Sequence, residues 1–206
     1  MKSVCVIGSG ISGSTIANLL SKKYKVDVYE KAKGIGGRSS HRRYLNKLGF
    51  DHGLQYISPK TSKFKKFCSG LQKKRVLKKW QGPHKFDHSK VLENKKHTKL
   101  IGAKGNNAIS KYLLKNINCI FGYELFKIER IRKNWKLSFL NGDVKYYEIL
   151  VISIPFAQSK KLLKKFLPNF FKNKKVKMEA NITVMTVTNK IKNNFSSFLF
   201  NDEVIG

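Results

Sequence analysis

An apolar run near the N-terminus breaks into a glycine pattern, and this pattern restricts the fold more than any other feature. Residues Val4–Ile7 are apolar and are followed by Gly8, Gly10 and Gly13 in the spacing G-x-G-x-x-G. The first glycine lets a strand turn sharply into a helix. The second removes a side chain where a pyrophosphate approaches, and the third lets the helix pack closely on the strand. The pattern therefore predicts a strand, a tight turn and a helix, in that order.

An acidic residue at the end of the next apolar run extends the prediction. We expect a strand at Ser3–Ile7, a helix at Ser12–Lys23 and a second strand at Val26–Glu30, whose final carboxylate follows Gly8 by 22 residues. A carboxylate at about this distance binds the hydroxyl pair of a ribose. A pyrophosphate would lie beside Ser12, because unpaired N–H groups and the helix dipole favour negative charge there. Together these features predict a dinucleotide site.

Two further segments connect the chain with a known family. They are Gly36-Gly37-Arg38 and Asp51-His52-Gly53-Leu54-Gln55-Tyr56. With these motifs the sequence resembles the renalase-like flavoproteins, within the wider class of flavin-dependent amine oxidases. The resemblance continues, with weaker motifs, over Ile101–Ala108, Trp135–Leu137 and Val151–Gln158.

The resemblance implies an α/β fold, namely a Rossmann-like FAD-binding domain of the GR2 type interleaved with an incomplete α+β substrate domain. We expect the FAD-binding domain to be discontinuous and to cover residues 1–57 and 98–158. The substrate domain would then cover residues 58–97 and 159–206. Family members are longer and close the FAD site with a C-terminal segment, which we do not find here. We therefore expect weak, reversible FAD binding and little turnover.

The expected cofactor is FAD, and its binding residues come from both arguments. The glycine pattern and the acid give Gly8, Gly10, Ser12, Gly13 and Glu30. The resemblance adds Lys31, Gly36, Gly37, Arg38, Gln55, Tyr56 and Leu125. In the family the arginine neutralises a phosphate or supports the flavin, a role that suits the bidentate guanidinium of Arg38. Gln55 would hydrogen-bond the ring system, whereas Tyr56 would either stack or fill core. We assign no catalytic residue and no metal ligand.

The function implied by the resemblance is oxidation of a reduced nicotinamide isomer, or of an amine. Hydride would pass to the flavin and then two electrons to O2, with the cofactor supplying the chemistry. Two alternatives stay open. The first is a non-catalytic or truncated FAD-binding fragment, and the second is a basic polyanion-binding module on a nucleotide-binding fold.

The charge of the chain bears on the second alternative. There are 43 basic and 12 acidic residues, which gives a net charge of +31. Such a charge predicts nonspecific binding to polyanions. The lysines are scattered in pairs, however, and we find neither an arginine cluster facing aromatic residues nor a nucleic-acid motif. We therefore interpret the charge as compositional drift and expect no specific nucleic-acid partner.

The remaining sequence features concern the compartment. Cys5, Cys68 and Cys119 are too widely spaced for a disulfide framework or a zinc site, which favours a reducing compartment. The N-terminal apolar run is too short for a signal peptide. We find no stretch of about 20 apolar residues that would span a membrane. These observations predict a cytoplasmic protein, or one on the matrix side of an organelle.

Hydrophobic spacing predicts the elements that follow the dinucleotide motif. A polar loop or hairpin is expected at Lys85–His97, and Asn141-Gly142 fits a tight hairpin turn. The predicted helices are Thr61–Leu71, Asn106–Lys115 and Gln158–Phe166. The predicted strands are Asn118–Phe121, Glu124–Ile131, Trp135–Leu140, Val144–Ile154 and Met178–Thr188.

Overall fold

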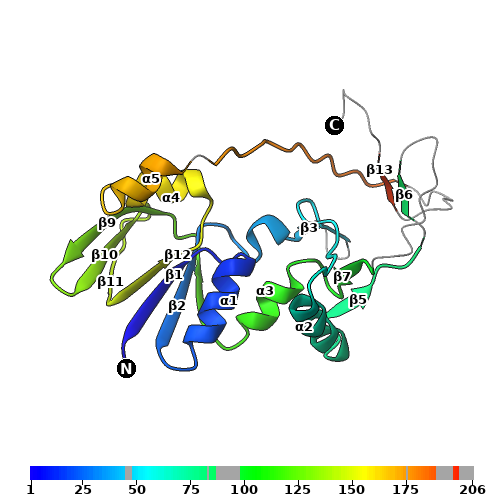
Figure 1. Cartoon of the computed structure of the whole chain (residues 1–206), viewed down its shortest axis with the longest axis horizontal. Coiled ribbons are helices and arrows are strands. Elements are labelled where there is room, and N and C mark those ends of the chain that lie inside the picture. The colour runs from blue at the N-terminus through cyan, green and yellow to red at the C-terminus, as the bar shows by residue number, and fades with distance from the viewer. Residues whose placement is uncertain (45–47, 83, 87–97, 175, 189–196, 200–206) are drawn as a thin grey trace.

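A four-stranded parallel sheet forms the centre of the molecule (Figure 1). The computed structural model describes residues 1–44, 48–82, 84–86, 98–174, 176–188 and 197–199. The strand order is β12-β1-β2-β8, and each neighbouring pair is parallel. The strands are β1 (Ser3–Ile7), β2 (Lys25–Glu30), β8 (Asn118–Phe121) and β12 (Ile149–Ile152). The expected α/β class with a parallel sheet is therefore confirmed.

Two layers cover the faces of this sheet. One face packs on α1 (Ile11–Leu20), and the other packs on an antiparallel sheet in the order β11-β10-β9. This second sheet consists of β9 (Leu125–Ile131), β10 (Asn134–Phe139) and β11 (Val144–Tyr147). Because successive side chains of a strand point to opposite faces, β1 serves both layers. Its Val4 and Val6 join the cluster around α1, whereas Cys5 and Ile7 join the cluster beneath the antiparallel sheet.

A smaller cluster lies beside α1. It joins α2 (Ser62–Lys73), β5 (Leu77–Lys79), β7 (Leu100–Gly102) and α3 (Ala108–Leu113) through a shared apolar core. Thr61 begins α2, because its hydroxyl accepts a hydrogen bond from the Phe64 amide. The remaining elements are the 3-10 turn η1 (Gly37–Ser39), β3 (Arg42–Tyr44), β4 (Leu48–Phe50), β6 (His84–Phe86), α4 (Phe156–Leu163), α5 (Pro168–Asn173) and β13 (Ser197–Leu199).

The single strand predicted at Val144–Ile154 is wrong. The chain divides at Glu148, where it leaves the antiparallel sheet as β11 and enters the parallel sheet as β12. The Glu148 side chain accepts a hydrogen bond from the Ser3 amide at 2.9 Å, which fixes this crossing to β1. The segment contains neither glycine nor proline at the crossing, so its sequence does not mark the change of sheet.

The strand predicted at Met178–Thr188 is also absent from the described residues. The segment is extended, but it pairs with none of the described strands, and Ile182 is 92% exposed. Alternating side chains produce a strand only where a partner strand completes the hydrogen bonds. Of the predicted loop at Lys85–His97, Lys85 and Phe86 belong to β6, and residues 87–97 lie outside the described residues.

The predicted helices exist, with different ends. The first starts at Ile11 and stops at Leu20, α3 covers only the middle of Asn106–Lys115, and α4 starts two residues earlier than predicted, at Phe156. Helix ends depend on local hydrogen bonds, which hydrophobic spacing does not encode. Within the described ranges, no helix combines the length and the apolar character that crossing a bilayer requires.

A chain of buried hydroxyl groups connects the two sheets. The Tyr147 hydroxyl donates to the Asp27 carboxylate at 2.8 Å, and it lies 2.9 Å from the hydroxyl of Tyr29. Burial and these hydrogen bonds raise the pKa of Tyr147, so its hydroxyl stays protonated. The core between the sheets is therefore held by a satisfied polar network as well as by apolar packing.

Candidate dinucleotide site

The turn between β1 and α1 has the geometry that the glycine pattern predicts. Gly8 has φ +99°, in the region that other residues rarely adopt. A Cβ placed on Gly13 would lie 2.0 Å from the carbonyl oxygen of Gly8 and 2.4 Å from Oγ of Ser153. Only glycine at position 13 lets the helix approach the strand this closely.

The start of α1 is open to an anion. The helix follows Gly10 without a side-chain cap, and its first turn contains no acidic residue. Ser12 is exposed in this turn. The first amides of a helix lack intrahelical partners, so they point their N–H groups at whatever lies in front of the helix. This is the arrangement that binds phosphate groups.

The Gly36-Gly37-Arg38 segment packs against this turn. The Gly36 amide donates to the carbonyl of Ser9 at 3.2 Å, and a Cβ on Gly37 would lie 3.1 Å from Cα of Gly10. Both glycines have positive φ. Arg38 follows in η1, and its side chain is exposed. Its guanidinium therefore belongs to the residue next to Gly37, which contacts Gly10.

Glu30 is buried at the end of β2, with 7% of its surface exposed. Its Oε2 accepts from the amide of Ser9 at 2.8 Å and from the Ser9 hydroxyl at 2.9 Å, and its Oε1 accepts from the Ala32 amide at 2.9 Å. A carboxylate has about four acceptor positions. Glu30 therefore anchors the turn and keeps capacity for one further donor.

The other two residues predicted from the neighbouring strands lie differently. Lys31 is half exposed and forms a surface ion pair with Glu124 at 3.9 Å. Leu125 is buried in the core between the sheets. Its side chain packs inside the core and not at an open surface, so the structure shows no place where it would contact a cofactor.

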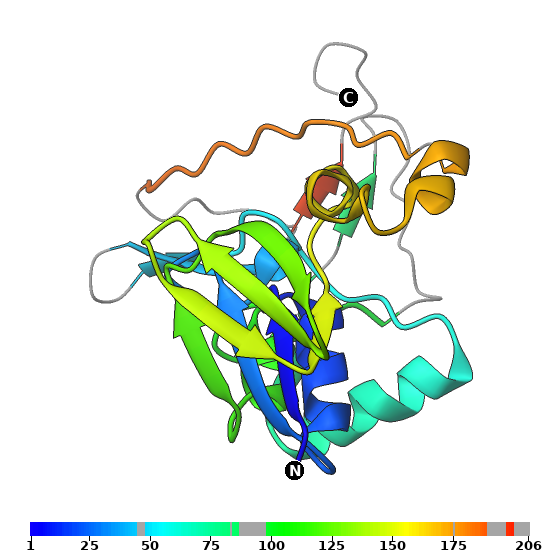
Figure 2. The ribbon, with the colours of Figure 1, turned by 90° about the vertical axis from the view of Figure 1, so that its left-hand side faces the viewer.

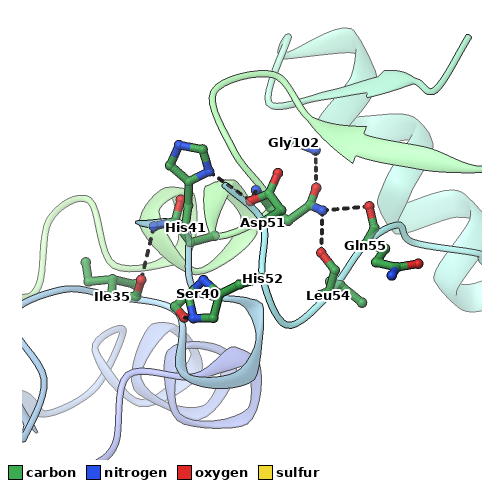
Figure 3. Close-up of polar contacts among 10 residues, drawn as sticks. Ile35, Ser40, His41, Asp51, His52, Leu54, Gln55 and Gly102 are labelled. Carbon is green, nitrogen blue, oxygen red and sulfur yellow. Dashed lines mark hydrogen bonds and ion pairs between the residues drawn. The ribbon is translucent and has the colours of Figure 1, made fainter. Parts of the chain in front are cut away.

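The segment Asp51–Tyr56 is held by a residue that the sequence reasoning did not select. Asn106 is 1% exposed, and its Oδ1 accepts from the amide of Gly102 at 2.8 Å. Its Nδ2 donates to the carbonyls of Leu54 and Gln55 at 2.6 and 2.9 Å (Figure 3). The side chain thus satisfies three buried backbone groups and fixes this segment to the start of α3.

The same network reaches the Gly36-Gly37-Arg38 loop. The Asp51 carboxylate accepts from the Asn106 amide at 2.7 Å and lies 2.9 Å from Nδ1 of His41 (Figure 3). A Cβ on Gly53 would lie 2.2 Å from the carbonyl oxygen of Arg38, so the two loops touch. The structure therefore brings Gly36-Gly37-Arg38 and the Asp51 segment together, as a cofactor site requires.

The end of that segment points elsewhere. Gln55 is exposed. The Tyr56 ring lies 5.7 Å from that of Trp80, and Nζ of Lys99 lies 4.6 Å from the Tyr56 centroid. These contacts favour a packing role for Tyr56, one of the two roles that the sequence left open.

Two further residues beside the turn were missed by the sequence reasoning. Ser153 directly follows β12, and its hydroxyl lies within hydrogen-bond distance of the Ile7 and Gly8 carbonyls at 2.8 and 3.1 Å. Asn107 donates to the Ile35 carbonyl at 3.1 Å, but its buried Oδ1 has no hydrogen-bond partner. The signal for Ser153 was available, because polar residues at the ends of parallel strands line such sites.

Among the described residues, no group of three or more His, Cys, Asp or Glu side chains could hold a metal ion.

Comparisons with known proteins agree with this geometry. The profile of the NAD(P)-binding Rossmann-like domain matches residues 6–71, which include the end of β1, α1, β2 and the Gly36–Arg38 loop. Among solved structures, the chain is similar to the tetracycline destructase Tet(51), with 15% identity and a TM-score of 0.54 over 79% of this chain. The match covers 41% of that protein, so the chain spans less than half of its length.

The structural likeness identifies a fold rather than an activity. As many as 815 solved chains match this one, and a fold so widely used supports many reactions. The family match covers the strand-turn-helix, and the likeness to the solved structure extends over 79% of the chain. The chain therefore contains a Rossmann-like dinucleotide-binding fold whose glycine turn, acidic strand end and Gly-Gly-Arg loop lie together.

Proposed function

We propose that the chain binds FAD, with the pyrophosphate at the start of α1 and the adenosine ribose on Glu30. The observation that carries the proposal is the contact of Gly36 and Gly37 with the uncapped turn at Gly10. Because Gly10, Gly36 and Gly37 carry no side chains, the backbone of both loops can approach a phosphate at this contact. The free acceptor capacity of Glu30 fits a ribose hydroxyl at the end of β2. The unpartnered Oδ1 of Asn107 lies in a residue that contacts the Gly36 loop.

Each residue of the site has a defined task in this proposal. The amides of Ile11 and Ser12 bind the pyrophosphate, and the exposed guanidinium of Arg38 neutralises part of its charge. Glu30 accepts a hydrogen bond from a ribose hydroxyl while it holds the turn through Ser9. When bound, FAD would supply two-electron redox chemistry that these side chains do not have.

A preference for FAD over NAD follows from the second loop. Gly36-Gly37-Arg38 adds a cation and close backbone contacts that a plain NAD site does not need. We expect a titration with FAD to give saturable binding that NAD does not displace at comparable concentration. FMN, which lacks the adenosine monophosphate half and therefore the pyrophosphate, is expected to compete poorly. Displacement by NAD at comparable concentration would contradict the preference for FAD.

Glu30→Ala is expected to weaken FAD binding by about 1–3 kcal/mol, the cost of losing a charged hydrogen bond. The measurement is calorimetric titration of FAD into the variant. Because Glu30 also holds the turn, the matched control is Ser9→Ala, which removes one donor to Glu30 and keeps the carboxylate. The control should retain near-normal affinity. If both variants lose FAD equally, Glu30 acts only as an anchor of the turn.

We further propose that the site belongs to an oxidoreductase of the renalase or amine oxidase type, acting on a reduced nicotinamide isomer or an amine with O2 as acceptor. The resemblance of the motifs supports this, and the fold is compatible with it. Because the chain spans less than half of the similar solved protein, this activity is proposed for the site rather than for the 206 residues alone. Oxygen consumption with saturating FAD and each substrate class tests it. A slow rate that depends on substrate is expected, and equal rates with and without substrate would contradict the proposal.

A further inference from the structure

The pair of helices α4 and α5 carries a concentrated positive charge that the dinucleotide site does not use. Between Phe156 and Lys174 the sequence contains six lysines and no acidic residue: Lys160, Lys161, Lys164, Lys165, Lys172 and Lys174. All six are exposed, and within the described part of the chain none of them forms an ion pair. The two helices lie at the end of the molecule opposite β6 and β13, and α5 projects at its periphery (Figures 1 and 2).

The lysines of α4 and of the turn after it are arranged on one side. Lys160 and Lys164 are four residues apart, as are Lys161 and Lys165, so each pair shares a helical face. Like charges at this spacing repel and destabilise a helix. The opposite side carries Leu162, Leu163 and Phe166, which pack on the core beneath the antiparallel sheet. The described residues therefore offset little of this charge: Glu129 interacts with Lys165 at longer range, and none of the four lysines forms a direct ion pair there.

Exposed apolar side chains lie among these cations. Leu167 is 49% exposed and Phe170 is 51% exposed. Leu167 also lines a pocket of about 560 Å³, together with Leu150, Ile152, Leu163, Phe166, Trp135 and Arg130. Arg130 lies over the ring of Trp135 at 5.0 Å and adds a further cation at this pocket. The segment from Lys160 to Lys174 thus combines exposed lysines with the exposed apolar side chains of Leu167 and Phe170.

We propose that the α4–α5 face binds the surface of an anionic lipid bilayer. Lysines next to exposed apolar side chains are typical of interfacial segments, because the cations attract anionic headgroups while the apolar groups enter the headgroup boundary. A single-stranded nucleic acid would use the cations and stack on Phe170, but the exposed aliphatic side chain of Leu167 adds nothing to such binding. The combination therefore favours lipid.

The test is flotation of the full chain with phosphatidylcholine vesicles, with and without phosphatidylglycerol. Binding is expected only when the anionic lipid is present. The variant Lys160→Gln/Lys161→Gln/Lys164→Gln/Lys165→Gln should lower the partition coefficient by roughly 100- to 1,000-fold, given the contribution of each lysine near an anionic surface. The matched control is Lys22→Gln/Lys23→Gln/Lys65→Gln/Lys66→Gln, which removes the same charge from α2 and the end of α1 and should retain most of the binding.

A second variant tests the apolar contribution. Phe170→Ser keeps every charge. It is expected to weaken vesicle binding several-fold, because the phenyl ring can no longer bury apolar area in the headgroup boundary. Equal losses in the two lysine variants would show that net charge alone acts, and would overturn the proposal. Unchanged vesicle binding by Phe170→Ser would also overturn the proposal. The same holds if the wild-type chain does not bind anionic vesicles and instead binds a single-stranded oligonucleotide through Lys160, Lys161, Lys164 and Lys165.

Discussion

Gly13→Ala is expected to disrupt both the fold at the turn and cofactor binding. The added methyl would lie 2.0 Å from the Gly8 carbonyl oxygen, which belongs to packed backbone, and 2.4 Å from Oγ of Ser153. Relief requires α1 to move away from β1, which costs about 1–3 kcal/mol or more of unfolding free energy. Chemical denaturation measures this loss. FAD affinity should fall more than about tenfold, since the phosphate-binding amides move with the helix.

Two glycine controls separate the effects on fold and on binding. Gly10 has φ −69° and would place a methyl 3.8 Å from its nearest neighbours, so Gly10→Ala should leave stability unchanged. The same methyl would occupy space in front of the helix and should still weaken FAD binding. Gly70→Ala in α2 meets no atom within 4 Å and should add about 0.5–1 kcal/mol. Unchanged FAD affinity in Gly10→Ala would place the pyrophosphate elsewhere.

Asn106→Ala is expected to be strongly destabilising, at about 3 kcal/mol. It leaves the Gly102 amide and the Leu54 and Gln55 carbonyls without their partner, and a buried unsatisfied group typically costs 1–3 kcal/mol. Thermal and chemical unfolding measure the loss. Release of the Asp51 segment should also lower FAD affinity, because this segment packs on the backbone of Arg38.

The adjacent asparagine is the matched control for this prediction. Asn107 is the next residue in the chain and is nearly as buried as Asn106. Its side chain makes a single hydrogen bond, to the Ile35 carbonyl, and its Oδ1 is unpartnered. Asn107→Ala should therefore cost clearly less than Asn106→Ala. Equal costs would show that cavity formation, rather than the network around Asp51, determines the effect.

The sequence predicted the elements that depend on local backbone chemistry. The turn at Gly8 and the close packing at Gly13 follow from the absence of a Cβ, so spacing alone was sufficient. The same holds for β1, β2 and β8, where short apolar runs end in glycine or polar residues. The contact of Gly36 and Gly37 with this turn was expected only from the resemblance.

The features that the sequence missed depend on tertiary partners. The change of sheet at Glu148 is set by Ser3, a residue 145 positions away. Asn106 looked like the start of a helix, and only the folded chain shows that it satisfies three distant backbone groups. The alternating residues Met178–Thr188 have strand periodicity, but periodicity cannot supply the neighbouring strand that pairing needs.

The most direct test of the account is a titration of the isotope-labelled chain with FAD, followed by the backbone amide signals in NMR spectra. The account predicts saturable shifts that are largest at Gly10–Gly13, with smaller ones at Gly36 and Gly37, and predicts that FMN reproduces them poorly. Shifts confined to other parts of the chain, or the absence of shifts at Gly10–Gly13 under saturating FAD, would contradict the assignment of this turn as the pyrophosphate site.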